Sequence, residues 1–260
     1  MKLLIKLGGT LLDAAGSRRR LSGEIAALAA SGHDVVVVHG GGKQMTRFLD
    51  ERGVESRFVN GLRVSTPEVI DAVLKVLAGS VNHQLVSALF QAGARSVGLS
   101  GVDAGLAEAE PLSDELGAVG RVVRTDARLL NILVEHGYLP VVACVAGDRE
   151  GRIYNVNADQ MAVACAAGFA ADRLIFLTDV DGVRGGDGET IRSMTEARCL
   201  ELIQSGIATG GMQAKLTAAC DAVRRGVSAV SIAPGATPDI IGEILRGGAY
   251  GTAILPESRS

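Results

Sequence analysis

The chain has 260 residues, of which 26 are basic and 29 acidic, so its formal net charge is −3. Hydrophobic residues make up 47% of it, but aromatic residues only 3%, with no tryptophan. This composition argues against nucleic-acid binding, because duplexes attract basic surfaces and single strands need aromatic rings for stacking. The length suffices to bury a core without disulfide or metal staples, and we interpret the four cysteines as buried thiols.

No membrane or export signal stands out in the sequence. A membrane-spanning helix needs ~18 or more uninterrupted apolar residues, and no such run occurs. The apolar stretch at the N-terminus meets Lys6 and then Gly8, and is too short for a signal peptide. We therefore expect a cytoplasmic protein that does not bind membranes.

Short apolar runs alternate with helical patterns along almost the whole chain. The runs predict strands at 3–7, 34–39, 95–99, 139–145, 173–178, 228–232 and 252–255. Helical periodicity predicts helices at 21–30, 44–51, 67–92, 127–136, 158–167, 195–204, 212–225 and 239–245. The less regular segment 105–124 is expected to form a β-hairpin. Strands interleaved with helices predict an α/β fold, a three-layer sandwich around a mainly parallel sheet, with any division into lobes near residue 170.

Two glycine-rich turns follow the first two predicted strands. Lys6 lies at the end of the first strand, before Gly8 and Gly9, and His39 ends the second strand before Gly40–Gly42. Open α/β sheets bind ligands at the carboxyl ends of their strands, and glycines let backbone amides approach an anion. The turns are candidates for a phosphate site, although each taken alone is equally well explained as an ordinary turn.

Three known loop signatures are absent. The sequence contains no Walker G-x-x-x-x-G-K-[ST] element, and no G-x-G-x-x-G follows either of the first two strands. An esterase oxyanion loop would require a G-x-S-x-G elbow, and the nearest candidate, 98–102, lacks the last glycine.

Polar residues precede the predicted helix at 158–167. Asn157 as N-cap with Gln160 three residues later makes a capping box, which leaves Asn155 and Asp159 unexplained. A carboxylate is favoured at a helix N-terminus, so Asp159 has a purely structural explanation as well. This motif alone does not decide between a cap and a site.

Two cations and one acidic turn are further candidates. Lys215 is expected in the first turn of its helix, where a cation opposes the helix dipole and suggests a bound anion. Arg63, within Asn60–Val64, suits a carboxylate, but a solvated loop arginine explains it too. Asp179–Gly182 follows a strand and either holds a nucleotide or forms a turn. None of the four histidines has metal-ligand spacing, so no protein metal site is expected, and His39 is expected to shape the glycine turn.

Taken in chain order, these motifs resemble the amino acid kinase superfamily. The segments that carry the resemblance extend over essentially the whole chain and are Lys6–Gly9, His39–Gly42, Asn60–Val64, Tyr154–Asp159, Thr178–Gly182 and Gly211–Lys215. The Asn-Gly-Leu-Arg-Val and Asn-x-Asn-x-Asp elements resemble the acetylglutamate kinases rather than the carbamate, aspartate, glutamate or uridylate kinases. Two departures are Ser100–Ala104, where relatives often carry a lysine, and Ile232–Ala236, which lacks the pattern of arginine-responsive members.

The resemblance implies ATP-dependent phosphorylation of the γ-carboxylate of N-acetyl-L-glutamate, the second step of arginine biosynthesis. Phosphoryl transfer requires positioning and charge neutralisation, and a carboxylate acceptor needs no general base. By resemblance, Lys6 and Lys215 neutralise the transferring group and Asp159 holds both lysines. Mg²⁺ is expected to be bound mostly by phosphates and water.

The resemblance also implies two binding sites. Gly41, Gly42, Arg63 and Asn155 would hold the acceptor, with Arg63 on its α-carboxylate, in an N-terminal lobe of residues 1–170. A C-terminal lobe, 171–260, would bind the nucleotide. The residues implied for the nucleotide and its phosphates are Gly8, Gly9, Asp179, Val180, Asp181, Gly182, Val183, Arg184, Ile207, Ala208 and Thr209.

The sequence leaves two alternative functions open and also suggests an oligomeric state. The alternatives are a kinase for an aminoadipate derivative in lysine biosynthesis and a catalytically silent amino-acid or nucleotide sensor on the same fold. Hexameric, arginine-inhibited members of the resembled family carry an extra helix before the first strand, which here begins at Lys2. We therefore expect a homodimer, joined through the helices between Pro67 and Ala92, with little inhibition by arginine.

Overall fold

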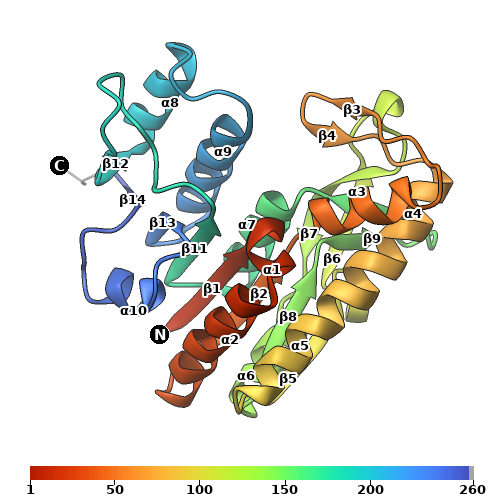
Figure 1. The fold of residues 1–260 in the computed structure, drawn as a ribbon, viewed down its shortest axis with the longest axis horizontal. Coiled ribbons are helices and arrows are strands. Elements are labelled where there is room, and N and C mark those ends of the chain that lie inside the picture. The colour runs from red at the N-terminus through yellow and green to blue at the C-terminus, as the bar shows by residue number, and fades with distance from the viewer. Residues whose placement is uncertain (258–260) are drawn as a thin grey trace.

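The computed structural model describes residues 1–257 and is built around a central eight-stranded sheet (Figure 1). Its strand order is β12-β14-β13-β11-β1-β2-β8-β5, and β14 runs antiparallel to β13 while the other neighbours are parallel. The predicted α/β fold with a mainly parallel sheet is confirmed. The strands are β1 Lys2–Leu7, β2 Asp34–His39, β5 Ser96–Ser100, β8 Leu139–Ala143, β11 Arg173–Thr178, β12 Ser193–Thr195, β13 Ala229–Pro234 and β14 Thr252–Leu255.

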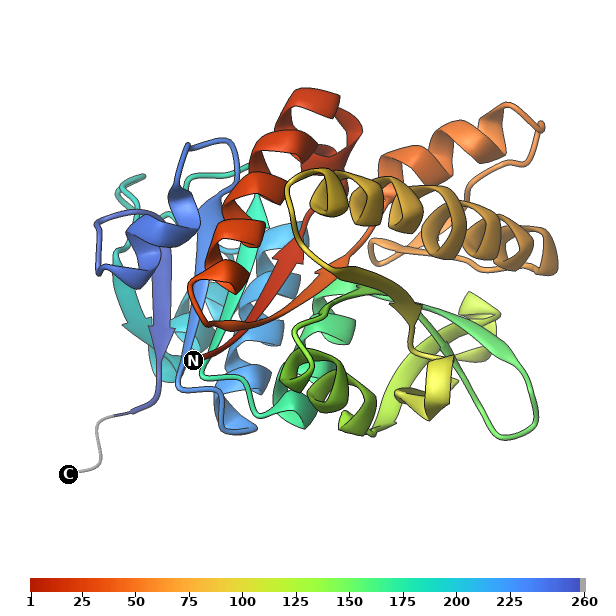
Figure 2. The same cartoon turned by 90° about the horizontal axis from the view of Figure 1, so that it is seen from below.

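Helices cover both faces of this sheet (Figure 2). One layer contains α2, α5 and α10, and the other contains α6, α7 and α9. The four consecutive valines of β2 are all buried, as expected for a central strand covered on both faces. Outside the long helical run described below, the helices are α1 Gly9–Asp13, α2 Ala15–Ala30, α3 Gly42–Asp50, α6 Arg128–Glu135, α7 Ala158–Phe169, α8 Glu196–Gln204, α9 Gly210–Arg224 and α10 Ile240–Leu245.

A second, smaller β-structure lies beside the main sheet. The strands β6 Ala107–Pro111 and β7 Val119–Thr125 form the antiparallel pair expected in 105–124. They close into a four-stranded barrel with β9 Val145–Gly147 and β10 Ile153–Val156. The single strand predicted over 139–145 is wrong in its extent, because the chain leaves the main sheet at Cys144 and enters this barrel. The strand β10, which carries Asn155, was not predicted.

The helix predicted over 67–92 is divided into three parts. Thr66 caps α4 Pro67–Val73, a π-helix, η1, covers Leu74–Val81, and α5 continues through Asn82–Gln91. By length and composition this run could cross a membrane, but it packs against α2 and the sheet strands β5 and β8. These contacts account for its buried apolar residues, whereas Leu74 and Phe90 stay exposed.

Several short elements were also not predicted from the sequence. They are α1, β10, β12, the strands β3 Phe58–Val59 and β4 Leu62–Arg63, and the 3₁₀ turns η2 Asp103–Gly105 and η3 Asp114–Leu116. Each is too short to give a periodic pattern. Cys144, Cys165, Cys199 and Cys220 are free and buried, as predicted.

Candidate active site

The two glycine turns meet at the carboxyl ends of β1 and β2. A methyl group on Gly9 would lie only 3.1 Å from the amide nitrogen of Gly42 and 3.2 Å from the Cα of Gly41. A methyl group on Gly41 would lie 2.5 Å from a methyl carbon of Leu77 in the π-helix η1. Side chains at Gly9 and Gly41 would therefore separate the two turns or push them off the neighbouring helix. The glycines allow two backbone segments to approach each other closely at the sheet edge.

Two lysines share one carboxylate beside these turns. The Nζ atom of Lys6, from β1, lies 2.7 Å from Oδ1 of Asp159, at the start of α7. The Nζ atom of Lys215, from α9, lies 3.1 Å from Oδ2 of the same carboxylate. Within residues 1–257, Lys6 and Asp159 are the two charged residues that are buried. Burial alone would raise the pKa of Asp159, but the two lysines outweigh it and hold that pKa below its usual value. With all three groups ionised, the cluster has a net charge of +1.

The position of Lys215 differs from the sequence prediction. The helix α9 begins at Gly210, so Lys215 lies in its second turn rather than its first. The argument that this lysine opposes the helix dipole is therefore wrong, because that effect fades beyond the first turn. Its side chain, 20% exposed, is directed instead to the carboxylate of Asp159.

The start of α7 is capped as predicted and also positions the shared carboxylate. The side-chain oxygen of Asn157 accepts hydrogen bonds from the amides of Asp159, at 2.9 Å, and Gln160, at 3.2 Å. The cap fixes the first turn, from which the Asp159 side chain reaches both lysines. The structural and functional explanations of this motif therefore hold together.

A cavity of about 250 Å³ opens beside Lys6, and we call it the glycine-loop pocket. Its lining includes all four residues predicted to bind the acceptor, Gly41, Gly42, Arg63 and Asn155. The side-chain amide of Asn155 donates a hydrogen bond of 3.0 Å to the hydroxyl of Ser65. Leu77 and Cys144 also line the pocket. Neither was predicted as a site residue, because neither belongs to a recognisable motif.

Arg63 lies on a two-residue hairpin at the edge of this pocket. Asn60 and Gly61 both have positive φ, at 49° and 78°, as a type I′ turn between β3 and β4 requires. The Asn-Gly pair between short apolar segments is the sequence signal from which this hairpin could have been predicted. The Arg63 guanidinium donates a 2.7 Å hydrogen bond to Thr46 and lies 4.6 Å from the Phe58 ring centroid. Partial burial lowers the pKa of Arg63, and Asp50 partly offsets this.

The amide of Gly8, which was expected to bind phosphate, has a partner within the fold. It donates a 3.1 Å hydrogen bond to the carbonyl of Leu177, at the end of β11, and so is already engaged. In contrast, Gly9 and Gly42 are the first residues of α1 and α3, and Gly41 is the N-cap of α3. Amides at these positions have no partner within their helices. The available donors of the two turns are therefore these three amides.

Of the residues predicted for the nucleotide, Gly9 lines this pocket, whereas 179–184 and 207–209 lie outside it, around the end of β11 and the start of α9. A methyl group on Gly186 would lie 3.3 Å from Cδ1 of Ile207, so the loop after β11 and the turn before α9 are neighbours. The amide of Val183 donates a 2.8 Å hydrogen bond to Thr252, and Val183 and Ala208 are buried. The predicted residues that are exposed are Asp179, Val180, Asp181, Arg184, Ile207 and Thr209.

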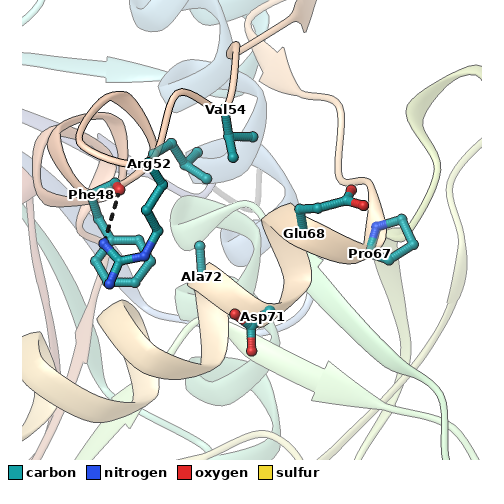
Figure 3. Close-up of a pocket in the computed structure, with 8 residues that line it drawn as sticks. Phe48, Arg52, Val54, Pro67, Glu68, Asp71 and Ala72 are labelled. Carbon is teal, nitrogen blue, oxygen red and sulfur yellow. Dashed lines mark hydrogen bonds between the residues drawn. The ribbon is translucent and has the colours of Figure 1, made fainter.

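Another hollow, of about 390 Å³, lies between α3 and α4 (Figure 3). There the Arg52 guanidinium stacks 3.5 Å from the centroid of the Phe48 ring and donates a 3.4 Å hydrogen bond to its carbonyl oxygen. Glu68 and Asp71 lie on the α4 side. None of the predicted site residues lines this hollow.

The fold agrees with comparisons to known proteins. The sequence profile of the amino acid kinase family matches residues 1–234, and the chain belongs to this family. It is 62% identical over 255 residues to the acetylglutamate kinase of Solibacter usitatus (strain Ellin6076), covering 98% of this chain and 99% of that protein. It is 44% identical over 236 residues to that of Geobacillus kaustophilus (strain HTA426), covering 90% of each. Within the family, the chain therefore belongs to the acetylglutamate kinases.

Solved structures support the fold. The chain matches smu.665 from Streptococcus mutans UA159 with a TM-score of 0.83 and 29% identity, over 98% of both chains. It matches N-acetylglutamate synthase from Neisseria gonorrhoeae with a TM-score of 0.88 and 24% identity, over 99% of this chain and 60% of that one. The second match, at this identity, supports the fold alone.

Proposed function

We propose that this enzyme transfers the terminal phosphoryl group of ATP to the side-chain carboxylate of N-acetyl-L-glutamate, a step of arginine biosynthesis that yields N-acetyl-γ-glutamyl phosphate. The identity of 62% with an acetylglutamate kinase, over nearly the whole of both chains, supports the substrates. The observation that carries the chemistry is the pair of lysines, Lys6 buried and Lys215 partly buried, that share Asp159 beside the glycine-loop pocket.

The charge of this cluster suits the reaction. The acceptor carboxylate and the phosphoryl group are both anionic and repel each other as they approach in line. Lys6 and Lys215 bring two positive charges, and Asp159 fixes their positions while cancelling only one. Cations held in place before the reaction stabilise the charge that develops on the transferring oxygens without reorganising. The acceptor is ionised at neutral pH, so the mechanism requires no general base.

We assign the glycine-loop pocket to the acceptor. The guanidinium of Arg63, at its edge, would bind the α-carboxylate, and the amides of Gly41 and Gly42 would bind oxygens near the reacting carboxylate. Asn155 would orient the acetylamino group through its side-chain amide. The side-chain carboxylate would then be directed toward Lys6, which lines the same cavity.

We assign the nucleotide to the C-terminal lobe, about residues 171–260, and the acceptor to the N-terminal lobe, about 1–170. The segments 179–184 and 207–209 would contact the nucleotide, and Gly9 would offer its amide to the phosphates. Asp159 is not a suitable ligand for Mg²⁺, because each of its carboxylate oxygens is paired with a lysine. Mg²⁺ would arrive with ATP, held by phosphates and water, and would neutralise phosphate charge.

We also propose a homodimer joined through the helical run 67–91. Leu74 and Phe90 on this run are 42% and 76% exposed, which leaves large apolar side chains on its outer surface. Light scattering should give twice the mass of the chain, and Phe90→Asp should shift it toward the monomer. A monomeric wild-type protein would contradict this assignment.

The acceptor assignment is tested by an assay that couples ADP release to a spectroscopic signal. N-acetylglutamate, glutamate and N-acetylaminoadipate would be compared at equal concentrations. We expect N-acetylglutamate to give the highest kcat/KM. A preference for N-acetylaminoadipate would move the enzyme to the aminoadipate alternative, and inactivity with all three would favour a sensor.

A further inference from the structure

A buried hydrogen-bond network lies behind the second glycine turn. Asn82, the first residue of α5, and His39, the last residue of β2, are 2% and 0% exposed. The side-chain nitrogen of Asn82 lies 3.0 Å from the carbonyl oxygen of Val141 and 3.0 Å from Nε2 of His39. The carbonyl oxygen of Leu99, at 3.4 Å, is a third partner of this nitrogen. Because its partners include two carbonyls, the nitrogen is a donor, and its two hydrogens are shared among these carbonyls and the imidazole.

This geometry favours one tautomer of His39. Its Nε2 atom accepts the hydrogen bond from Asn82, so the single hydrogen of the neutral ring is on Nδ1. That Nδ1 lies 3.1 Å from the carbonyl oxygen of Gly40, to which it donates. Burial lowers the pKa of His39 to about 4, and the ring is therefore neutral at physiological pH.

The carbonyl of Gly40 and the amide of Gly41 belong to one planar trans peptide, in which C=O and N–H point in opposite directions. The hydrogen bond with buried His39 holds the Gly40 carbonyl toward the core, so the Gly41 N–H points away from the core. On that side lies the glycine-loop pocket, which Gly40 and Gly41 both line. Two contacts hold Gly40 from other sides. Its amide donates to the carbonyl of Leu7, at 3.3 Å, and a methyl group on it would lie 3.2 Å from the side chain of Ala158.

We propose that Asn82 and His39 are positioning residues, which set the Gly40–Gly41 peptide so that the Gly41 amide faces the anionic acceptor. Asn82 acts through the tautomer of His39, and His39 acts through the Gly40 carbonyl. The nature of the anion rests on the proposed function, whereas the orientation of the peptide does not. The absence of a side chain at Gly98 provides the space for the Asn82 side chain, because a methyl group on Gly98 would lie 2.1 Å from the Asn82 side-chain oxygen.

The kinetic test uses Asn82→Leu, which keeps the volume but removes both donors. We expect kcat/KM for N-acetylglutamate to fall about tenfold or more, with KM for ATP unchanged, because a misdirected amide weakens the acceptor contacts. The matched control is Leu89→Ala, a fully buried change in the same helix that lowers the melting temperature without touching the network. A loss in Asn82→Leu no larger than in this control would overturn the proposal.

A second set of variants tests whether Asn82 acts through hydrogen bonds to His39 and from His39 to the Gly40 carbonyl, which we call the relay, or only through packing. Asn82→Leu should have little further effect in a His39→Leu background, because the relay is already broken. His39→Asn, whose amide nitrogen can take the place of Nδ1, should recover part of the kcat/KM lost in His39→Leu. Additive effects on the logarithm of kcat/KM, or no recovery, would contradict the relay.

Nitrogen NMR of the wild-type enzyme tests the tautomer without any substitution. We expect the hydrogen of His39 on Nδ1, and a hydrogen on Nε2 would overturn the proposal even if every variant failed to fold. An enzyme with no activity toward any acceptor would refute the proposed function instead. The NMR result would still decide whether Asn82 sets the tautomer of His39.

Discussion

The glycine-loop pocket and the nucleotide segments are organised differently. In the pocket, Lys6 and Gly41 are buried, and every residue assigned to the acceptor lines one cavity. In the nucleotide segments, 179–184 and 207–209, six of nine residues are exposed, and Val183 and Ala208 are buried anchors. The proposed acceptor site is therefore built into the packed edge of the sheet, whereas the proposed nucleotide site consists of loops on its surface.

This difference follows from what each ligand requires. A small acidic acceptor must be held in line with the phosphoryl group, and a packed backbone and lysines fixed by a buried carboxylate hold a precise geometry. A nucleotide offers a large surface and several phosphate oxygens, so loops with a few anchored residues can bind it. Substitutions in the pocket should thus affect the reaction or the acceptor, and substitutions in the loops should affect ATP binding more mildly.

The largest effect is expected from the lysines. Lys6→Met and Lys215→Met should each lower kcat by about 100-fold or more, because each removes a charge that stabilises the transition state. The KM values should change much less. Steady-state kinetics with both substrates checks this, and near-normal turnover with a raised KM would contradict the assigned role.

Arg63→Ala should have the next largest effect, on the acceptor alone. Its contact with a carboxylate that does not react is present in the ground state and the transition state alike, so KM for N-acetylglutamate should rise about 10-fold or more. KM for ATP and kcat should stay close to wild type. Arg57→Ala, an exposed arginine preceding the same hairpin, is the matched control. If KM for ATP rises instead, Arg63 belongs to the nucleotide site.

Gly182→Ala tests the segments proposed to bind the nucleotide. Gly182 has φ of 145°, and a methyl group there would lie 2.8 Å from Thr190 and 2.8 Å from Thr252. The substitution should distort the loop and raise KM for ATP several-fold, leaving KM for the acceptor unchanged. Gly188→Ala, which has positive φ but open space, controls for backbone strain alone. A change confined to the acceptor would reverse our division of the two sites.

The smallest effect concerns stability and pH. The pKa of His39 is about 4 in the folded protein against an ordinary value of 6.5, so the unfolded chain binds a proton more readily between these values. The free energy of unfolding should therefore fall as pH drops below about 6.5, by less than about 1 kcal/mol between pH 7 and pH 6. Urea titrations at several pH values measure this. His39→Asn should lose this part of the pH dependence, whereas exposed His136→Asn should keep it.

The sequence predicted much of this arrangement because the strong signals are local. Buried strands such as β2 and β11 were predicted with their observed bounds, since apolar runs between turns are unambiguous. The residues proposed to bind the acceptor were predicted because the family resemblance linked several motifs, each of which was ambiguous when taken alone. The network of Asn82 and His39 could not be predicted, because it joins an unremarkable helix position to a strand end 43 residues away. The engaged amide of Gly8 likewise depends on the pairing of β1 with β11.

We propose that the lysine cluster promotes the transfer of a phosphoryl group to the side-chain carboxylate of the acceptor held in the glycine-loop pocket. Hydroxylamine traps an acyl phosphate as a hydroxamate, whose mass identifies the acceptor and whose amount can be compared with the ADP formed. We predict one N-acetylglutamyl hydroxamate for each ADP with the wild-type enzyme, and a rate reduced about 100-fold or more for Lys6→Met. ADP formation without hydroxamate, or hydroxamate formation by Lys6→Met at the wild-type rate, would contradict the account.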